Sequence, residues 1–235
     1  MAKNIILRAK DFKYPTKLEL SKIDQDNPQL LPFDLKFKSV IHSILEEKKA
    51  LPLVHKESLL NEWNRCLLNK LGKLGFSFQS VLTHYNRGFC RLDGKKLKVH
   101  HVNRIQFDYY AEIFYYQFYS VVDTIGQIIN VYFDLSIPEW QLHFKKLKLK
   151  NTTVQQLINA FNKSTEEASK YRNAFTHKFP VNETDYRTSL KTENNRSSLG
   201  SGTGYYIKPD ILIHNLKEAR GNLKLLLDGL REILI

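Results

Sequence analysis

Apolar residues recur at steps of three and four along most of the chain, which is the spacing of one face of an α-helix. The clearest example covers residues 103–135. Its main apolar row is Phe114, Phe118, Val121, Ile125, Ile128 and Tyr132, and the neighbouring row is Tyr115, Tyr119, Val122, Ile129 and Phe133. Two adjacent rows make a broad apolar face, so this segment is predicted to be the central helix of a bundle.

The same spacing predicts five further helices, over residues 34–50, 56–75, 76–85, 152–179 and 209–235. Residues suited to helix starts lie in front of three of them: Asp34, Thr152 or Thr153, and Pro209 with Asp210. Gly72 or Gly75 is expected to end the second helix, and Pro180 to end the fourth, since glycine and proline commonly terminate helices.

The remaining segments carry turn-forming residues. Residues 1–34 contain three prolines and are expected to form an irregular arm with at most a short strand. A basic loop or hairpin is expected over 88–102, and a flexible loop over 187–204. The sequence thus predicts an all-α helical bundle of four to six helices with an irregular N-terminal extension. We expect an arm with accessory helices (1–102) and a bundle (103–235) within one continuous globular unit.

One stripe of the central helix is polar. It recurs at steps of four and three and consists of Tyr116, Ser120, Asp123, Gln127, Asn130 and Asp134. The stripe is either the solvent-facing side of the helix or a set of buried groups that partner other polar side chains, because unpartnered polar groups are costly inside a bundle. The sequence leaves both interpretations open.

The charge balance favours a polyanionic partner. The chain has 36 Lys and Arg against 24 Asp and Glu, a formal net charge of +12. Such a surplus attracts RNA and other phosphate polymers, although a lysine-rich surface is an alternative explanation. Two basic clusters are candidate RNA-binding sites, the first with Lys95, Lys96, Lys98 and Arg104, the second with Lys145 and Lys146. The alternative for each cluster is a solvated loop.

Several kinds of site are excluded by what the sequence lacks. It has no phosphate-binding glycine loop and no HExxH, and its two cysteines do not have metal-ligand spacing. We therefore expect neither a cofactor nor a metal. The polar stripe argues against a membrane span, and the first residues do not resemble a signal peptide. A cytoplasmic protein is expected.

The remaining chemistry lies in the run YRNAFTHKFP, residues 171–180. Arginine grips phosphate oxygens, and histidine exchanges a proton near neutral pH. Arg172 and His177 would lie about 140° apart around the helix, and Asn173 is placed to hydrogen-bond the His177 ring. Arg172 and His177 together are the minimum set of catalytic groups for metal-free RNA cleavage. Candidate supporting residues from the polar stripe are Asp123, Ser120 and Asn130. An arginine and a histidine at this spacing also occur by chance about once in such a chain.

The run Arg172-Asn173-Ala174-Phe175-Thr176-His177 resembles the R-N-x-x-x-H form of the Rx4–6H motif of the HEPN superfamily. The helix order over 103–235 is also similar. The resemblance implies an α-helical bundle, commonly a homodimer whose two motifs meet at the interface. It implies a metal-independent endoribonuclease of the toxin–antitoxin or antiviral defence type, which cleaves RNA by 2′-OH attack and has an antitoxin or defence partner.

The resemblance assigns catalysis to Arg172 and His177, with Asn173 as their polar companion. The alternative is a catalytically inactive HEPN-like module that binds RNA, a nucleotide or a partner protein. Phe179 stands where one toxin branch of the superfamily, with the motif Rx4HxY, has a tyrosine. Regulation by modification of that tyrosine is therefore not expected here.

Overall fold

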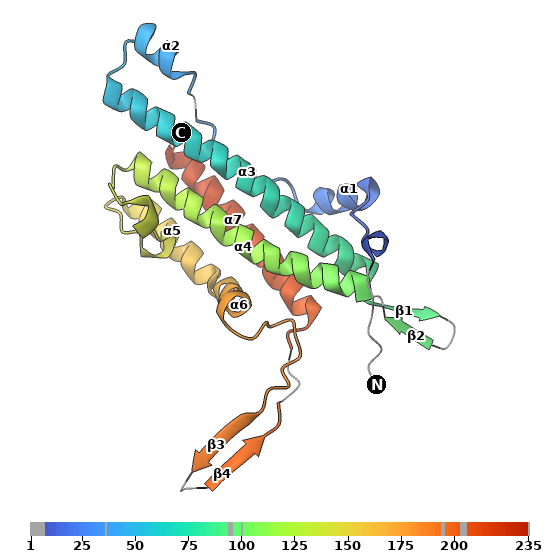
Figure 1. Cartoon of the computed structure of the whole chain (residues 1–235). Coiled ribbons are helices and arrows are strands. Elements are labelled where there is room, and N and C mark those ends of the chain that lie inside the picture. Colours follow the sequence, from blue (N-terminus) through green and yellow to red (C-terminus); the bar gives the residue numbers. More distant parts are fainter. Residues whose placement is uncertain are drawn as a thin grey trace.

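A computed structural model describes residues 8–35, 37–93, 96–99, 101–193, 196–202 and 206–234. Within these residues the chain forms seven α-helices (Figure 1): α1 Lys17–Asp26, α2 Val40–Leu45, α3 Leu51–Arg87, α4 His101–Tyr132, α5 Thr152–Ser164, α6 Glu166–His177 and α7 Pro209–Leu234. The predicted all-α helical bundle is confirmed.

Three long helices form the centre of the bundle. α3 and α4 lie side by side along much of their length and are joined by the predicted hairpin, β1 Cys90–Asp93 and β2 Lys96–Val99. α7 packs behind them (Figure 1). The two predicted apolar rows of α4 face the core, where Phe114, Tyr115, Phe118, Ile125, Ile128 and Ile129 are fully buried. α3 also contributes to this core, and the division of the chain at residue 102 stays a prediction.

α3 is one continuous helix of 37 residues. It passes through Gly72 and Gly75, so the predicted end at these glycines was wrong. A Cβ atom on either glycine would meet nothing within 4 Å, which shows that neither is required for a close approach. A mid-helix glycine costs about 1 kcal/mol. Burial of the apolar face of α3 in the common core outweighs that cost.

The predicted single helix over 152–179 is instead interrupted at Thr165 and forms α5 and α6. The N-cap of α5 is Asn151, whose side-chain oxygen accepts a hydrogen bond from the Val154 amide at 3.1 Å. Thr165 is buried, and its hydroxyl donates to the Phe161 carbonyl at 2.8 Å. A threonine that bonds back to its own helix competes with the regular helical pattern, so α6 has a direction of its own.

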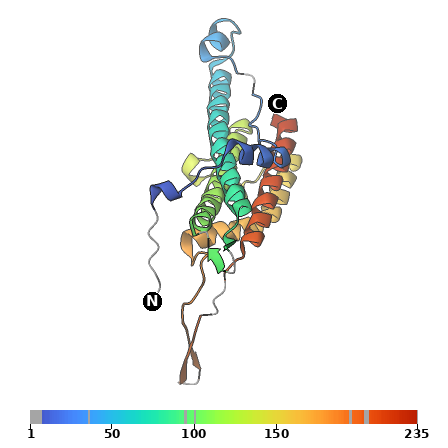
Figure 2. The same ribbon diagram turned by 90° about the vertical axis from the view of Figure 1, so that its right-hand side faces the viewer.

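The N-terminal arm is more helical than predicted. It contains α1, which begins with a capping box between Thr16 and Glu19. The next helix, α2, begins after the Ser39 cap and not at Asp34. Figure 2 shows that α2 and the start of α3 extend past the other helices at one end.

The segment predicted as a flexible loop over 187–204 contains a second hairpin. Its strands are β3 Ser189–Glu193 and β4 Arg196–Gly200, paired antiparallel. The hairpin points away from the bundle, at the opposite end from α2 (Figures 1 and 2). In the described ranges, none of the helices has the length and apolar character needed to cross a bilayer.

Candidate functional site

α6 places the R-N-x-x-x-H motif at the edge of the bundle. Its buried face consists of Ala168, Tyr171, Ala174 and Phe175. The ring of Phe175 lies 5.7 Å from the ring of Tyr115 on α4, which fixes the rotation of α6 about its own axis. The intervening residues therefore face outward: Arg172 is half-buried, whereas Asn173 and His177 are exposed.

Arg172 lines a groove of about 530 Å³ between α4, α5, α6 and the segment that follows α4. We call it the Arg172 groove. Its charged and amide lining residues are Asp123, His143, Lys145, Lys146, Asn162, Arg172 and Asn173. One carboxyl group therefore faces three permanent cations and a histidine. A concave surface with this balance attracts anions.

The Arg172 guanidinium has an unused donor. Its carbon lies 6.0 Å from the centre of the Tyr119 ring, and Nη1 donates to Oδ1 of Asn173 at 3.4 Å. Nε is buried without a hydrogen-bond partner among the described residues, and no ion pair joins Arg172 to a carboxylate there. Buried donors are normally satisfied. An unsatisfied guanidinium donor in a groove suits an oxygen of a bound phosphate or carboxylate.

Lys145 lies beside Arg172 on the same aromatic ring. Its Nζ is 5.9 Å from the centre of the Tyr119 ring and donates to Oγ of Ser169 at 2.7 Å. Burial raises the pKa of Tyr119 to about 12, so its hydroxyl stays protonated and donates to the Thr165 carbonyl at 3.2 Å. Tyr119 thus ties α4 to the break before α6 and carries two cations on its ring. A bound anion would relieve the repulsion between those cations.

Asp123 is exposed at the rim, although neighbouring groove atoms remove part of its hydration. This loss of hydration raises the pKa of its carboxyl group above the ordinary value. The positive charges of Arg172, His143 and Lys70 oppose the rise. Asp123 is therefore close enough to Arg172 for their charges to interact, without forming an ion pair with it among the described residues. Its supporting role stays a prediction.

The predicted polar stripe of α4 divides into two parts. Ser120 is half-buried and Asp123 exposed, whereas Gln127 and Asn130 are each only 8% exposed. Ser120 does not line the Arg172 groove. Asn130 does not partner the motif either, because its amide bonds to both backbone groups of Ile137. The prediction that Asn130 supports the motif directly was wrong, since the chain after α4 folds back over this end of the helix.

Residues 136–150, here called the groove segment, are held on α4 by close packing. A Cβ on Gly126 would lie 2.7 Å from Cδ2 of Leu142, so a larger residue would force the buried Leu142 side chain to shift. Phe144 and Leu147 are buried in the core, and Lys145, which lies between them, is exposed. Anchoring by the apolar residues fixes the position of the lysine in the groove.

His177 is the last residue of α6 and does not line the Arg172 groove. The hydrogen bond expected between Asn173 and the His177 ring is not formed in the described part of the chain. Asn173 accepts from Arg172 instead. Arg172 and His177 therefore point in different directions from α6, as predicted from the helical angle. Within one chain, only Arg172 of the two lines the groove.

The two predicted basic clusters have different positions. Lys145 and Lys146 line the Arg172 groove, far in sequence from the motif that they accompany. Lys95 lies outside the described residues. Lys96 and Lys98 belong to β2, where only the backbone is described. The second cluster therefore adds to the site, and the first stays a prediction.

Arg104, which was predicted to bind RNA, makes several contacts within the fold. Its Nε donates to Asp108 at 2.7 Å, and Nη2 donates to the Asn182 carbonyl at 3.2 Å. The guanidinium also lies 5.4 Å from the centre of the Phe89 ring. These contacts engage Arg104 within the fold, and its side chain is 25% exposed. RNA binding by Arg104 stays a prediction.

Sequence reasoning did not identify four residues of the groove, namely Tyr119, His143, Asn162 and Ser169. Asn162 carries a second unpartnered buried atom, its Oδ1. A signal existed for His143 alone: Leu142 and Phe144 alternate with His143 and Lys145, as expected for a segment with one buried side. The other residues come together only through the fold.

Within the described ranges, no group of three or more His, Cys, Asp or Glu side chains is arranged to hold a metal ion. Cys66 is a free, half-buried cysteine on α3. The expectation that the protein uses neither a metal nor a cofactor stays a prediction.

Comparison with known proteins gives one match. The model of the Cthe2314-like HEPN family matches residues 63–234, from within α3 to the last residue of α7. No curated protein and no solved structure is similar enough to the chain to count as a match. The match covers nearly three quarters of the chain and includes every helix that shapes the Arg172 groove. The chain therefore belongs to the Cthe2314-like HEPN family of the HEPN superfamily.

Proposed function

We propose that this protein is a metal-independent endoribonuclease of the toxin–antitoxin or antiviral defence type. Arg172 binds the scissile phosphate, His177 transfers the proton, and Asn173 orients the guanidinium. An antitoxin or another defence protein would be its partner. The observation that supports this proposal best is the Arg172 groove. There, within the part of the chain that the structure describes, a half-buried guanidinium has an unused Nε donor and no carboxylate ion pair.

The arrangement suits cleavage by the neighbouring 2′-OH. In that reaction the 2′-oxygen loses its proton and attacks phosphorus, and the 5′-oxygen leaves and takes up a proton. The products are a 2′,3′-cyclic phosphate and a 5′-OH. Negative charge increases on the phosphate oxygens in the transition state, so cations that are already fixed beside it stabilise it more than the ground state. Arg172 and Lys145 on the Tyr119 ring meet that requirement.

The position of His177 leads us to propose a homodimer. His177 does not line the groove of its own chain, and it lies exposed at the end of α6. A second copy that packs against this edge would bring its own His177 to the Arg172 groove. Proton transfer needs hydrogen-bond contact with the reacting oxygen, so the second copy supplies what one chain lacks.

The alternative is a catalytically inactive HEPN-like module that binds RNA, a nucleotide or a partner protein. It is favoured by the same separation of His177 from the groove. The groove would then hold a phosphate without turnover, and the imidazole would have no part in the chemistry.

The first experiment measures cleavage of a single-stranded RNA in excess EDTA. We expect a product with a 2′,3′-cyclic phosphate and resistance of the same sequence made of DNA. His177→Ala should abolish cleavage, whereas His214→Ala, an exposed histidine on α7, should leave it unchanged. His143→Ala tests the imidazole that lines the groove within one chain. Cleavage that survives in His177→Ala, or its absence from the native protein, would overturn the proposal.

The second experiment tests whether the site is shared between two copies. Arg172→Ala and His177→Ala proteins are inactive alone. Mixed dimers of the two contain one intact pair if arginine and histidine come from different copies. Random mixing should then restore about a quarter of the native activity. If both groups act within one chain, mixing restores nothing, and the shared site is refuted.

A further inference from the structure

A second groove, of about 590 Å³, opens between α3, α4 and the N-terminal arm. Four aromatic residues line it: Tyr14 of the arm, Phe76 of α3, and Tyr109 and Tyr110 of α4. We call these four residues the aromatic platform. The charged lining residue is Lys73, and no carboxylate lines the groove in the described part of the chain.

The platform is unusually open to solvent for its apolar content. The exposed fractions are 74% for Tyr14, 58% for Tyr109 and 49% for Phe76. Single exposed apolar residues are ordinary on a protein surface, but a cluster of them indicates a binding surface. The rings are also in mutual contact, with 5.2 Å between the centres of Tyr109 and Tyr110 and 5.8 Å between those of Phe76 and Tyr110.

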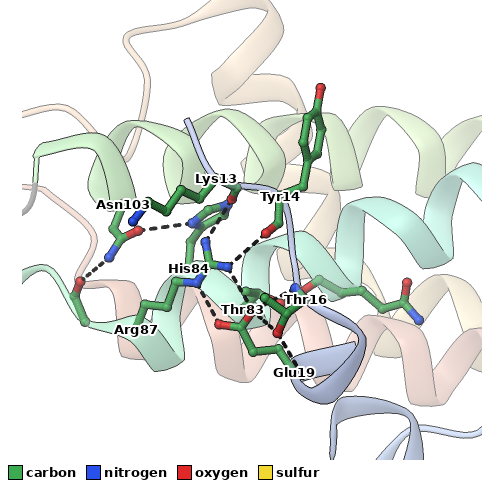
Figure 3. Close-up of polar contacts among 10 residues, drawn as sticks. Lys13, Tyr14, Thr16, Glu19, Thr83, His84, Arg87 and Asn103 are labelled. Carbon is green, nitrogen blue, oxygen red and sulfur yellow. Dashed lines mark hydrogen bonds and ion pairs between the residues drawn. The ribbon is translucent and has the colours of Figure 1, made fainter. Parts of the chain in front are cut away.

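The centre of the platform is fixed from behind. The ring of Tyr110 stacks on the fully buried His84 at 6.1 Å with an angle of 2° between the planes. Nδ1 of His84 lies 3.3 Å from the amide oxygen of Asn103, whose nitrogen donates to the Gly88 carbonyl at 3.0 Å (Figure 3). The platform therefore exists before any ligand binds, which reduces the entropy lost on binding.

The edge formed by Tyr14 is held by Arg87. This guanidinium donates to both carboxylate oxygens of Glu19, at 2.7 and 2.8 Å, and to the carbonyls of Lys13 and Tyr14, at 2.8 and 3.0 Å (Figure 3). Figure 3 shows the ring of Tyr14 turned away from this cluster. Arg87 thus positions the backbone of the arm and leaves the Tyr14 ring at the groove.

The platform and the Arg172 groove are both formed in part by α4, and Tyr109 of the first and Asp123 of the second lie near one side of that helix. Tyr109, Tyr116 and Asp123 are seven residues apart, so they fall on one side of the helix. The fourteen residues from Tyr109 to Asp123 rise about 21 Å. At the stacked spacing of about 3.4 Å per nucleotide, this distance corresponds to about six nucleotides.

We propose that the aromatic platform stacks the bases of a single-stranded RNA whose scissile phosphate lies in the Arg172 groove. Sites for single strands combine aromatic rings with cations and need no fixed sequence. The rings, Lys73 and the lack of a lining carboxylate give this combination, in a chain with a net charge of +12. A base-paired duplex does not expose its base faces, so the platform selects unpaired RNA. This inference rests on the proposed function.

The test measures the affinity for a fluorescent ten-nucleotide oligodeoxyuridine, which has no 2′-OH and is not cleaved. Tyr109→Ala and Phe76→Ala should each weaken binding about fivefold or more, because one stacked base contributes about 1–3 kcal/mol. Tyr109→Phe keeps the ring and should bind as the native protein does. Tyr186→Ala is the matched control, since Tyr186 is 75% exposed and lines neither groove. The affinity for the same oligonucleotide in a duplex should be the same in all of these variants and in the native protein.

Three results would overturn the proposal. The first is unchanged affinity in both alanine variants. The second is an equal loss in Tyr109→Phe, which would show that the ring face is not used. The third is a change of oligomeric state in Tyr109→Ala, seen by light scattering without nucleic acid, together with unchanged affinity. That combination would assign the surface to a protein contact.

Failure of the platform and failure of the proposed function give different results. If the protein binds the oligodeoxyuridine through the platform but cleaves no RNA, the proposed function fails and the platform stands. If it cleaves RNA and the platform variants have the native KM for a ten-nucleotide RNA, the platform fails alone. We expect these variants to raise the KM for ten nucleotides and to leave the KM for three nucleotides unchanged, since three do not reach both grooves.

Discussion

Replacement of Asn130 by alanine removes two hydrogen bonds that hold the groove segment on α4. The Asn130 amide nitrogen donates to the Ile137 carbonyl at 2.8 Å, and its oxygen accepts from the Ile137 amide at 3.1 Å. Each bond contributes about 1 kcal/mol, and partly buried backbone groups left without partners add to the loss. We expect the free energy of unfolding, measured by urea titration, to fall by about 2–3 kcal/mol.

The variant Asn130→Asp separates the two bonds. Its carboxylate can still accept from the Ile137 amide, but it places a second oxygen against the Ile137 carbonyl. At neutral pH we expect it to be as unstable as the alanine variant. The protonated acid can donate to that carbonyl, so its folded pKa lies above the ordinary value of about 3.9. The folded state then binds more protons, and the deficit relative to the native protein narrows as the pH falls through the folded pKa toward about 3.9.

The same variants connect the groove segment to RNA binding. Asn130 does not line the Arg172 groove, yet displacement of the segment would move Lys145. We expect Asn130→Ala to weaken binding of an uncleavable RNA analogue, measured by fluorescence anisotropy at a temperature where the protein is folded. A loss of stability below about 0.5 kcal/mol, with native affinity, would refute the reasoning. Packing of Leu142 and Phe144 would then suffice to hold the segment.

Two further changes test other contacts. Gly126→Ala brings a Cβ to 2.7 Å from Leu142 Cδ2 and should destabilise by about 1–3 kcal/mol in urea titration, despite the better helix propensity of alanine. Combined with Leu142→Ala it should cost less than the sum of the two, and strict additivity would show that they do not clash. Burial lowers the pKa of His84, against the effect of its Asn103 contact. The unfolded chain therefore binds the proton more readily than the folded protein does. The contribution of neutral His84 to the free energy of unfolding is complete above about pH 6.5 and is lost as the pH falls through the folded pKa. The loss is at most about 1.4 kcal/mol per pH unit. Urea titrations should show a smaller slope with pH in His84→Gln, and equal slopes would contradict the assignment.

The helices were predictable where one face is continuously apolar. The spacing over α4 and α7 predicted both helices and most of their buried residues. The predictions failed where local signals competed with tertiary packing: Gly72 and Gly75 do not end α3, and Thr165 breaks a helix whose apolar pattern continues across it. Such choices depend on which neighbour is available for packing, and this information is not local in the sequence.

The site was predictable only in part. The motif identified Arg172, and the helical angle predicted its separation from His177. Lys145 belonged to an identified basic cluster, but nothing in the sequence indicated that it shares the Tyr119 ring with Arg172. The polar stripe gave the least reliable prediction, because its two halves meet different neighbours. Asp123 faces the groove, and Asn130 meets backbone groups of a segment that has no regular structure to predict.

The hairpin of β3 and β4 does not pack into the core of the helices. All residues of its two strands are exposed, apart from Gly200, which is half-exposed. An isolated two-stranded hairpin is marginally stable in water, so its amide protons should exchange with solvent at a rate set by hairpin opening alone. Those of α4 should exchange only when the bundle opens. One hydrogen-exchange experiment on the intact protein therefore compares two independent parts of the chain. A ligand that stabilises the bundle slows amide exchange in α4, and a ligand that slows amide exchange in the hairpin has to contact the hairpin.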